Sequence, residues 1–93
     1  MSKVILEGYV LAADANLAAI KRELPTHIQL TRQEKGCLVF EVSQDRDNAN
    51  RFNVYEEFVS QSAFELHQQR IIGTEWSKVS ANLEKHYKTS SVG

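Results

Sequence analysis

The spacing of apolar residues alternates between a strand-like and a helix-like period along this chain. The order of these segments limits the fold more than any other feature. Strand-like alternation, rich in β-branched and aromatic residues, covers residues 3–12, 37–42, 51–59 and 83–89. Helical spacing of apolar residues covers residues 17–31 and 62–72. A shorter helix is expected after Gly73 and Thr74. The order β-α-β-β-α-β predicts a ferredoxin-like α+β fold, in which the helices cover one face of an antiparallel sheet.

Local signals refine this prediction at three places. Pro25 lacks an N–H and disfavours helical geometry at the residue before it, so we expect two helical pieces with a kink or break there. Gly36 is expected to end the second piece as a left-handed C-cap. In the strand at residues 37–42, alternation predicts that Leu38, Phe40 and Val42 share one face and that Cys37 lies on the other.

Length and charge set the broad class of the protein. Ninety-three residues predict a single domain, with a core over about residues 3–87 and a loose tail at 88–93. A net charge of −1 argues against nucleic acid and anionic membrane as partners. Cys37 is the only cysteine, and no metal-ligand spacing is present. The sequence shows neither a signal peptide nor a long apolar run, so the cytoplasm is the expected location.

The first predicted strand is apolar on both sides. Val4, Leu6 and Val10 share one face, whereas Ile5, Tyr9 and Leu11 share the other. Helices can cover only one face of such a sheet, and a large exposed apolar face is unusual for a monomer. We therefore expect a homodimer in which the sheet face of a second copy covers the remaining side.

Two histidines are the leading candidates for catalysis. His67 falls on the apolar stripe that contains Phe64 and Ile71, and His27 projects close to the side of Ile20 and Leu24. Both imidazoles should therefore point toward the sheet and line one pocket as general base or acid. The alternative is that each is a core or interface histidine with a hydrogen-bond partner. His86, in a polar stretch, is expected at the surface.

Other side chains are candidates for binding a substrate. Glu56 occupies a position where alternation calls for an apolar residue, so it should be paired or have a raised pKa, in a functional or a structural role. Aromatic residues could wall a pocket for a flat organic molecule, although ordinary core packing is the alternative for each. These aromatic candidates are Phe40, Tyr55, Phe64 and Trp76.

Three short motifs, taken together, resemble the antibiotic biosynthesis monooxygenase domain family. They are T-x-x-E-x-G-C from Thr31, Y-E-x-F from Tyr55 and A-F-x-x-H from Ala63. The resemblance runs from about Lys3 to Tyr87 and implies a dimeric ferredoxin-like α+β barrel. It also implies small aromatic or quinol-like substrates that are oxidised by O₂ without metal, flavin or haem.

Members close to this pattern include an isomerase of the phosphorylated autoinducer-2 signal, which is similar around the histidines that correspond to His27 and His67. The chain also departs from some members. Its first strand has no asparagine of the kind that haem-degrading members use, so haem cleavage is not expected. Phe58 occupies a position where many monooxygenases have tryptophan.

Three hypotheses follow for the activity. The first is an oxidoreductase without a cofactor, in which His27 or His67 deprotonates a phenol or enol that then reduces O₂. The second is an isomerase or tautomerase of a small carbonyl compound that need not be oxidised. The third is a dimeric module that binds a ligand without catalysis.

Overall fold

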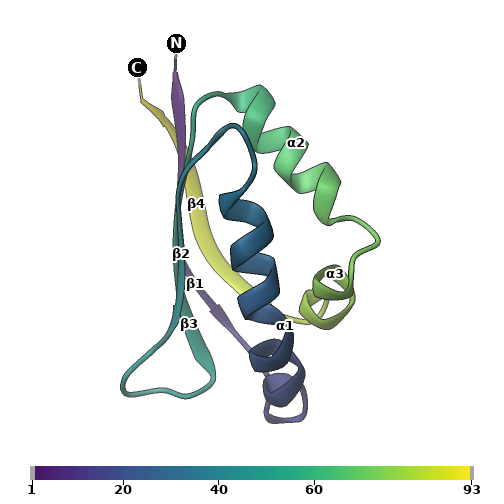
Figure 1. Ribbon diagram of the computed structural model, residues 1–93. Helices are drawn as coiled ribbons and strands as arrows, with labels where there is room; N and C mark the ends of the chain where they lie inside the picture. The colour runs from purple at the N-terminus through teal and green to yellow at the C-terminus, as the bar shows by residue number, and fades with distance from the viewer. Residues whose placement is uncertain (1, 93) are drawn as a thin grey trace.

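The computed structural model describes residues 2–92 and contains one antiparallel sheet with helices against a single face (Figure 1). The elements are β1 (Lys3–Leu11), α1 (Asp14–Arg32), β2 (Cys37–Gln44), β3 (Arg51–Phe58), α2 (Gln61–Ile71), α3 (Glu75–Ser80) and β4 (Glu84–Val92). The four strands lie in the order β2-β3-β1-β4. This is the predicted ferredoxin-like architecture, with α3 as the expected short extra helix.

The alternation of the two central strands is as predicted. Leu6 pairs with Glu56 and Val10 pairs with Phe52, so all four side chains point toward the helices, and all four are buried. The residues between them face the opposite side, where Figure 1 shows no covering element. The hydrophobic core therefore lies between the sheet and the helix layer, where β1 and β3 contribute one wall.

The prediction for β2 is wrong at its start. The pairing of β2 with β3 shifts between Cys37 and Val39, which leaves Leu38 as an extra, bulged residue. Leu38 is consequently exposed, whereas Cys37 packs with the core on the helix side. Phe40 and Val42 keep the predicted face, because they follow the bulge. A bulge reverses alternation locally, and the hydrophobic pattern does not reveal it.

The predicted break at Pro25 is also wrong, because α1 is one helix of 19 residues with Pro25 inside it. The buried residues of α1 continue across the proline at Ile20, Leu24, His27 and Thr31, all on one face. Pro25 itself is exposed, so the backbone carbonyl that loses its helical partner can bind water. Packing of the helix on both sides of Pro25 outweighs the free-energy cost of the backbone hydrogen bond that the proline removes.

Gly36 is not a left-handed C-cap. The helix already ends at Arg32 with Gln33 as its cap, and Gly36 has no positive φ. A glycine is needed here because α2 lies very close: a Cβ built at Gly36 would be 2.4 Å from the Cβ of Ala63. Absence of a side chain thus lets the connection after α1 pass against the start of α2.

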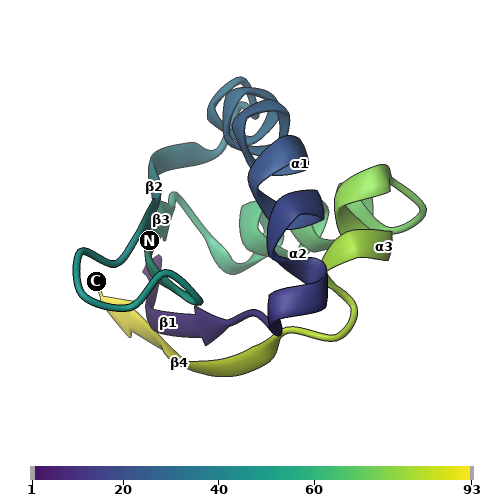
Figure 2. The ribbon, with the colours of Figure 1, turned by 90° about the horizontal axis from the view of Figure 1, so that it is seen from below.

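The last strand extends closer to the C-terminus than the sequence indicated. Residues 88–92, expected to be a loose tail, continue β4 and pair with β1 as far as Val92 opposite Lys3. Residue 93 lies outside the described residues. Every residue of β4 is exposed, and the strand forms one edge of the sheet, beside β1 (Figure 2). No helix within residues 2–92 is long and apolar enough to cross a membrane.

Candidate active site

A cavity of about 350 Å³ lies between the sheet and the helices. Six of the seven side chains predicted for the site line it: His27, Phe40, Glu56, Phe64, His67 and Trp76. They come from α1, the hairpin of β2 and β3, α2 and α3. The remaining wall is largely aliphatic, with Leu6, Val10 and Ile20 among its residues. The folding of the chain therefore brings the two histidines into one partly open cavity with a buried carboxyl.

His27 is held by aromatic packing. Its ring stacks on Trp76 at a centroid distance of 4.6 Å and meets Phe40 edge-on at 5.4 Å. Among the described residues nothing hydrogen-bonds to His27, and no fully enclosed polar side-chain atom lacks a partner, so at least part of its polar edge reaches the cavity. Burial, together with the nearby His67 and Arg70, lowers the pKa of His27 to about 3. His27 is therefore neutral at physiological pH.

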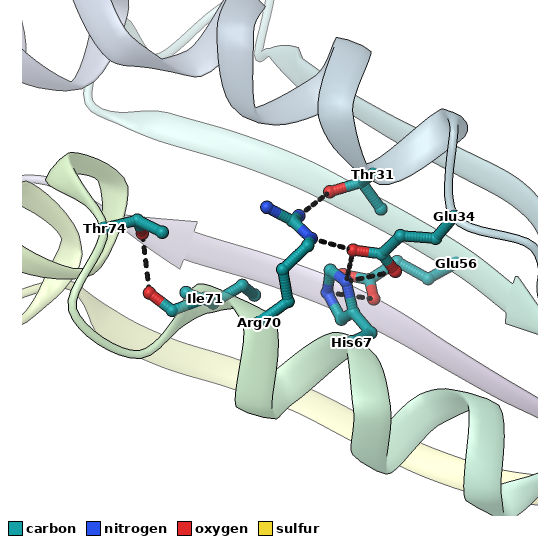
Figure 3. A network of polar contacts seen from close by, with 7 residues as sticks. All are labelled: Thr31, Glu34, Glu56, His67, Arg70, Ile71 and Thr74. Atoms are coloured by element: carbon teal, nitrogen blue, oxygen red, sulfur yellow. Dashed lines mark hydrogen bonds and ion pairs between the residues drawn. The ribbon is translucent and has the colours of Figure 1, made fainter.

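His67 lies 6.0 Å from His27, centroid to centroid, and is oriented by polar partners (Figure 3). Its Nδ1 is 3.0 and 3.1 Å from the two carboxylate oxygens of Glu34. Arg70 donates to the same carboxylate through Nε and to Thr31 Oγ1 through Nη2, the latter at 3.0 Å. Burial lowers the pKa of His67, although the Glu34 carboxylate acts in the opposite direction.

Glu56 completes the polar part of the cavity. Its Oε1 lies 4.0 Å from Nε2 of His67, and its side chain is buried on β3. Burial raises the pKa of Glu56 to about 7, and the negative charge of Glu34 adds to this effect. The sequence predicted a paired carboxyl or a raised pKa at this position, and the pKa of Glu56 is indeed raised. At neutral pH Glu56 can hold a proton beside an imidazole that lacks one.

Tyr55 is the one predicted site residue that the structure does not bring to this cavity. It neighbours Glu56 on β3, so strand alternation points it to the opposite face of the sheet. There its hydroxyl donates to Glu57 Oε2 at 2.5 Å. His86 is at the surface, as predicted, where it stacks on Tyr9 and contacts Glu84 Oε2 at 2.8 Å.

Sequence reasoning missed several polar residues at or behind the cavity, and four of them have ionisable side chains. Glu34 and Arg70 orient His67, whereas Lys85 and Tyr87 line the cavity from β4. The signal for Glu34 was available, because it is the glutamate of the T-x-x-E-x-G-C motif. Lys85 and Tyr87 gave no signal, since they lie in a polar stretch of the sequence on an edge strand.

Tyr87 reaches the cavity because its partner on β1 is a glycine. Gly8 pairs with Tyr87 and has a φ of 148°, which few residues other than glycine adopt. A Cβ at Gly8 would lie 2.6 Å from the Cα of Tyr87. Glycine therefore allows β4 to approach β1 closely at this point.

No group of three or more metal-ligating side chains lies together within residues 2–92. The cavity offers two imidazoles, the carboxyl of Glu56, a phenol and an ammonium group, among aromatic and aliphatic walls. One amide and two hydroxyls also line it, from Gln68, Ser77 and Ser80. Such a set can move protons and can hold a small, flat, mainly apolar molecule.

Comparison with known proteins assigns the family. A sequence model described as "Antibiotic biosynthesis monooxygenase" matches residues 4–88. The chain belongs to the antibiotic biosynthesis monooxygenase family. Membership agrees with the motifs that carried the resemblance, and it supports a general monooxygenase-like role. No curated protein matches the chain.

Solved structures share the family fold at low sequence identity. A Nitrosomonas europaea protein, provisionally assigned to the same monooxygenases, is 20% identical with a TM-score of 0.76, over 100% of this chain and 97% of that one. A Deinococcus radiodurans protein with the same provisional assignment is 24% identical with a TM-score of 0.70, over 97% and 90%. The Pseudomonas aeruginosa protein PA3566 is 24% identical, TM-score 0.70, over 98% and 90%.

Proposed function

We propose that this member of the antibiotic biosynthesis monooxygenase family oxidises a small phenol or quinol with O₂, without a metal, flavin or haem. The observation that carries the proposal is the orientation of His67. A carboxylate holds its Nδ1 at 3.0 Å, and its Nε2 lies within 4.0 Å of Glu56 in an otherwise largely apolar cavity. An imidazole held in this way is suited to remove a proton from a substrate hydroxyl.

The proposed reaction balances with the substrate as the source of all electrons. His67 takes the hydroxyl proton, and the resulting phenolate transfers one electron to O₂, which gives superoxide and a phenoxyl radical. The two radicals combine, so that a C–O bond forms at a ring carbon that bears hydrogen. That carbon then loses its proton, the O–O bond breaks, and the leaving oxygen is protonated to water. The ring carbon becomes a carbonyl, and the net change is substrate plus O₂ to quinone plus water.

The two histidines have different roles in this proposal. An imidazole with a pKa of about 3 is a weak base, so His27 is assigned to orienting the substrate by hydrogen bonding rather than to deprotonation. His67 has the carboxylate of Glu34 to stabilise its protonated form once the substrate proton arrives. Glu56, protonated in about half of the molecules near pH 7, is the assigned proton donor to the leaving oxygen.

An O₂-uptake assay with a panel of phenols and hydroquinones tests the proposal. Turnover should consume one O₂ per substrate, and ¹⁸O₂ should place one labelled atom in the product and one in water. Replacement of His67 by alanine should lower turnover by about 100-fold or more, because general base catalysis is lost. His86→Ala is the matched control, since His86 is an exposed histidine on β4. Undiminished turnover after His27 and His67 are both replaced would refute the mechanism.

One observation favours a second candidate function. The neutral imidazole of His67 and the carboxyl of Glu56, whose pKa is about 7, face the same cavity 4.0 Å apart. An acid and a base placed in this way are suited to an enzyme that removes a proton at one carbon and returns it at another. Such an isomerase of a small carbonyl compound needs no O₂. Turnover that is equal in air and under nitrogen would favour it, whereas ligand binding without turnover in either gas would favour a binding module.

A homodimer through the open sheet face is part of the proposed function. Ile5, Tyr9 and Leu11 are only partly buried. They alternate along β1 with residues that are buried under the helices, so they lie on the opposite face of the sheet. A second copy would remove their apolar surface from water. Light scattering on the purified chain tests this directly: a monomer mass at micromolar concentration would refute the dimer, and an Ile5→Lys variant should dissociate it.

A further inference from the structure

The contacts behind His67 form a chain of polar groups that reaches from α2 back to α1 (Figure 3). Glu34 lies just after the end of α1 and accepts from His67 Nδ1 at 3.0 Å. Arg70, one turn after His67 on α2, donates to the same carboxylate. It also donates to Thr31 Oγ1 at 3.0 Å, and Thr31 is completely buried. Each of these four side chains is therefore held in place by a hydrogen bond to at least one of the others.

A carboxylate can accept hydrogen bonds but cannot donate them. A neutral imidazole beside Glu34 must therefore carry its proton on Nδ1, which leaves the lone pair on Nε2 directed toward Glu56 and the cavity. We infer that Glu34, supported by Arg70, is a positioning residue that selects the Nδ1–H tautomer of His67. This inference rests on the proposed function for its kinetic consequence, but the tautomer itself can be measured without any substrate.

The charges that face His67 determine how its titration should respond. Glu34 approaches from the connection after α1, and Glu56 approaches from β3. Arg70 lies on the same helix as His67, and His27 lies 6.0 Å away on α1. From β4, Lys85 and Tyr87 line the same cavity, and burial, followed by the charge of Glu56, raises the pKa of the Tyr87 phenol.

Burial lowers the pKa of His67, the carboxylate of Glu34 raises it, and the charge of Arg70 lowers it. Removal of the negative charge at Glu34 should therefore move the titration of His67 to lower pH. In Glu34→Gln, the amide can face His67 with either its carbonyl or its NH₂ group, so the tautomer is no longer selected. The NH₂ group would favour a proton on Nε2 and so remove the lone pair from the cavity.

Long-range ¹H–¹⁵N NMR of the uniformly labelled chain reads the tautomer of His67 directly. In the wild-type chain at pH 7.5 we expect a protonated Nδ1 and an unprotonated Nε2. In Glu34→Gln we expect the ring signals to move toward a mixture of tautomers. Glu65→Gln is the matched control, since Glu65 is an exposed glutamate of α2 that hydrogen-bonds to Gln61. A wild-type spectrum with the proton on Nε2 would overturn the inference, and this measurement does not depend on whether any variant folds.

Kinetics supply the second readout. Once a phenol that the protein oxidises has been identified, its turnover can be compared between wild type and Glu34→Gln. The variant should lower kcat by about 100-fold, leave KM nearly unchanged, and shift the acid limb of the pH–rate profile to lower pH. An unchanged profile with an unchanged tautomer would overturn the role of Glu34. If no phenol is oxidised, the proposed function fails, but the NMR result still decides whether Glu34 selects the tautomer.

Discussion

The buried carboxyl of Glu56 makes a quantitative prediction about stability. Glu56 is only 8% exposed, and burial raises its pKa from 4.5 to about 7. The unfolded chain releases the proton near pH 4.5, whereas the folded chain holds it until about pH 7. The carboxyl therefore contributes most favourably below pH 4.5, and this contribution is lost as the pH rises through 7. At about 1.4 kcal/mol per pH unit, the loss amounts to about 3 kcal/mol.

Replacement of Glu56 by glutamine removes this titration and keeps the size of the side chain. Urea unfolding of the wild-type chain and of Glu56→Gln at several pH values between 4 and 8.5 should show it. We expect the variant to gain about 3 kcal/mol relative to wild type between the lowest and the highest pH, because only the wild type must bury a charge above pH 7. A difference in the free energy of unfolding that is the same at every pH reflects the exchange of a carboxyl for an amide. It does not affect how this difference changes with pH.

The matched control is Glu41→Gln, because Glu41 is an exposed glutamate on the neighbouring strand β2. This variant makes the same exchange of glutamate for glutamine at an exposed position, so it separates an effect of the exchange itself from the effect of burial at Glu56. A difference between wild type and Glu56→Gln that is independent of pH would refute the reasoning. It would mean that Glu56 titrates in the fold as it does in the unfolded chain.

Further predictions follow from the same packing. His27 must stay neutral when folded, so wild type should lose stability as the pH falls from 6.5 toward 3, and His27→Phe should show a shallower acid transition by circular dichroism. Gly36→Ala should destabilise by about 1–3 kcal/mol in urea unfolding, because its Cβ would meet that of Ala63 at 2.4 Å. Phe40→Ala should cost about 3–5 kcal/mol in the same assay, since Phe40 is buried against both histidines.

The fold was largely predictable because it depends on hydrophobic periodicity. Alternation in β1 correctly placed Val4, Leu6 and Val10 on one face of the strand, and this pattern is local in sequence. The errors arose where a local rule met a tertiary constraint. Pro25 is accommodated inside α1 because both flanking turns pack against the sheet, and Leu38 is exposed because β2 contains a bulge.

The site was predictable only in part. Helical spacing put His67 on the buried face of α2, and the misfit of Glu56 in an apolar strand face identified it as unusual. Tyr55 was included for its hydroxyl, although its place next to Glu56 directs it to the other face. Glu34 and Arg70 are 36 residues apart, so no local pattern could show that they share a carboxylate–guanidinium contact behind His67.

The sequence by itself determined the order of the elements and the burial of two histidines and a glutamate, because side-chain periodicity decides which face of a strand or helix is covered. The tertiary structure alone decided how these groups differ. Within residues 2–92, His27 stacks on Trp76 and has no hydrogen-bond partner. His67 is held by Glu34, and burial moves the pKa of Glu56 to about 7. A pKa and a tautomer depend on burial and on charges a few ångströms away, and those neighbours come from segments that only the fold brings together.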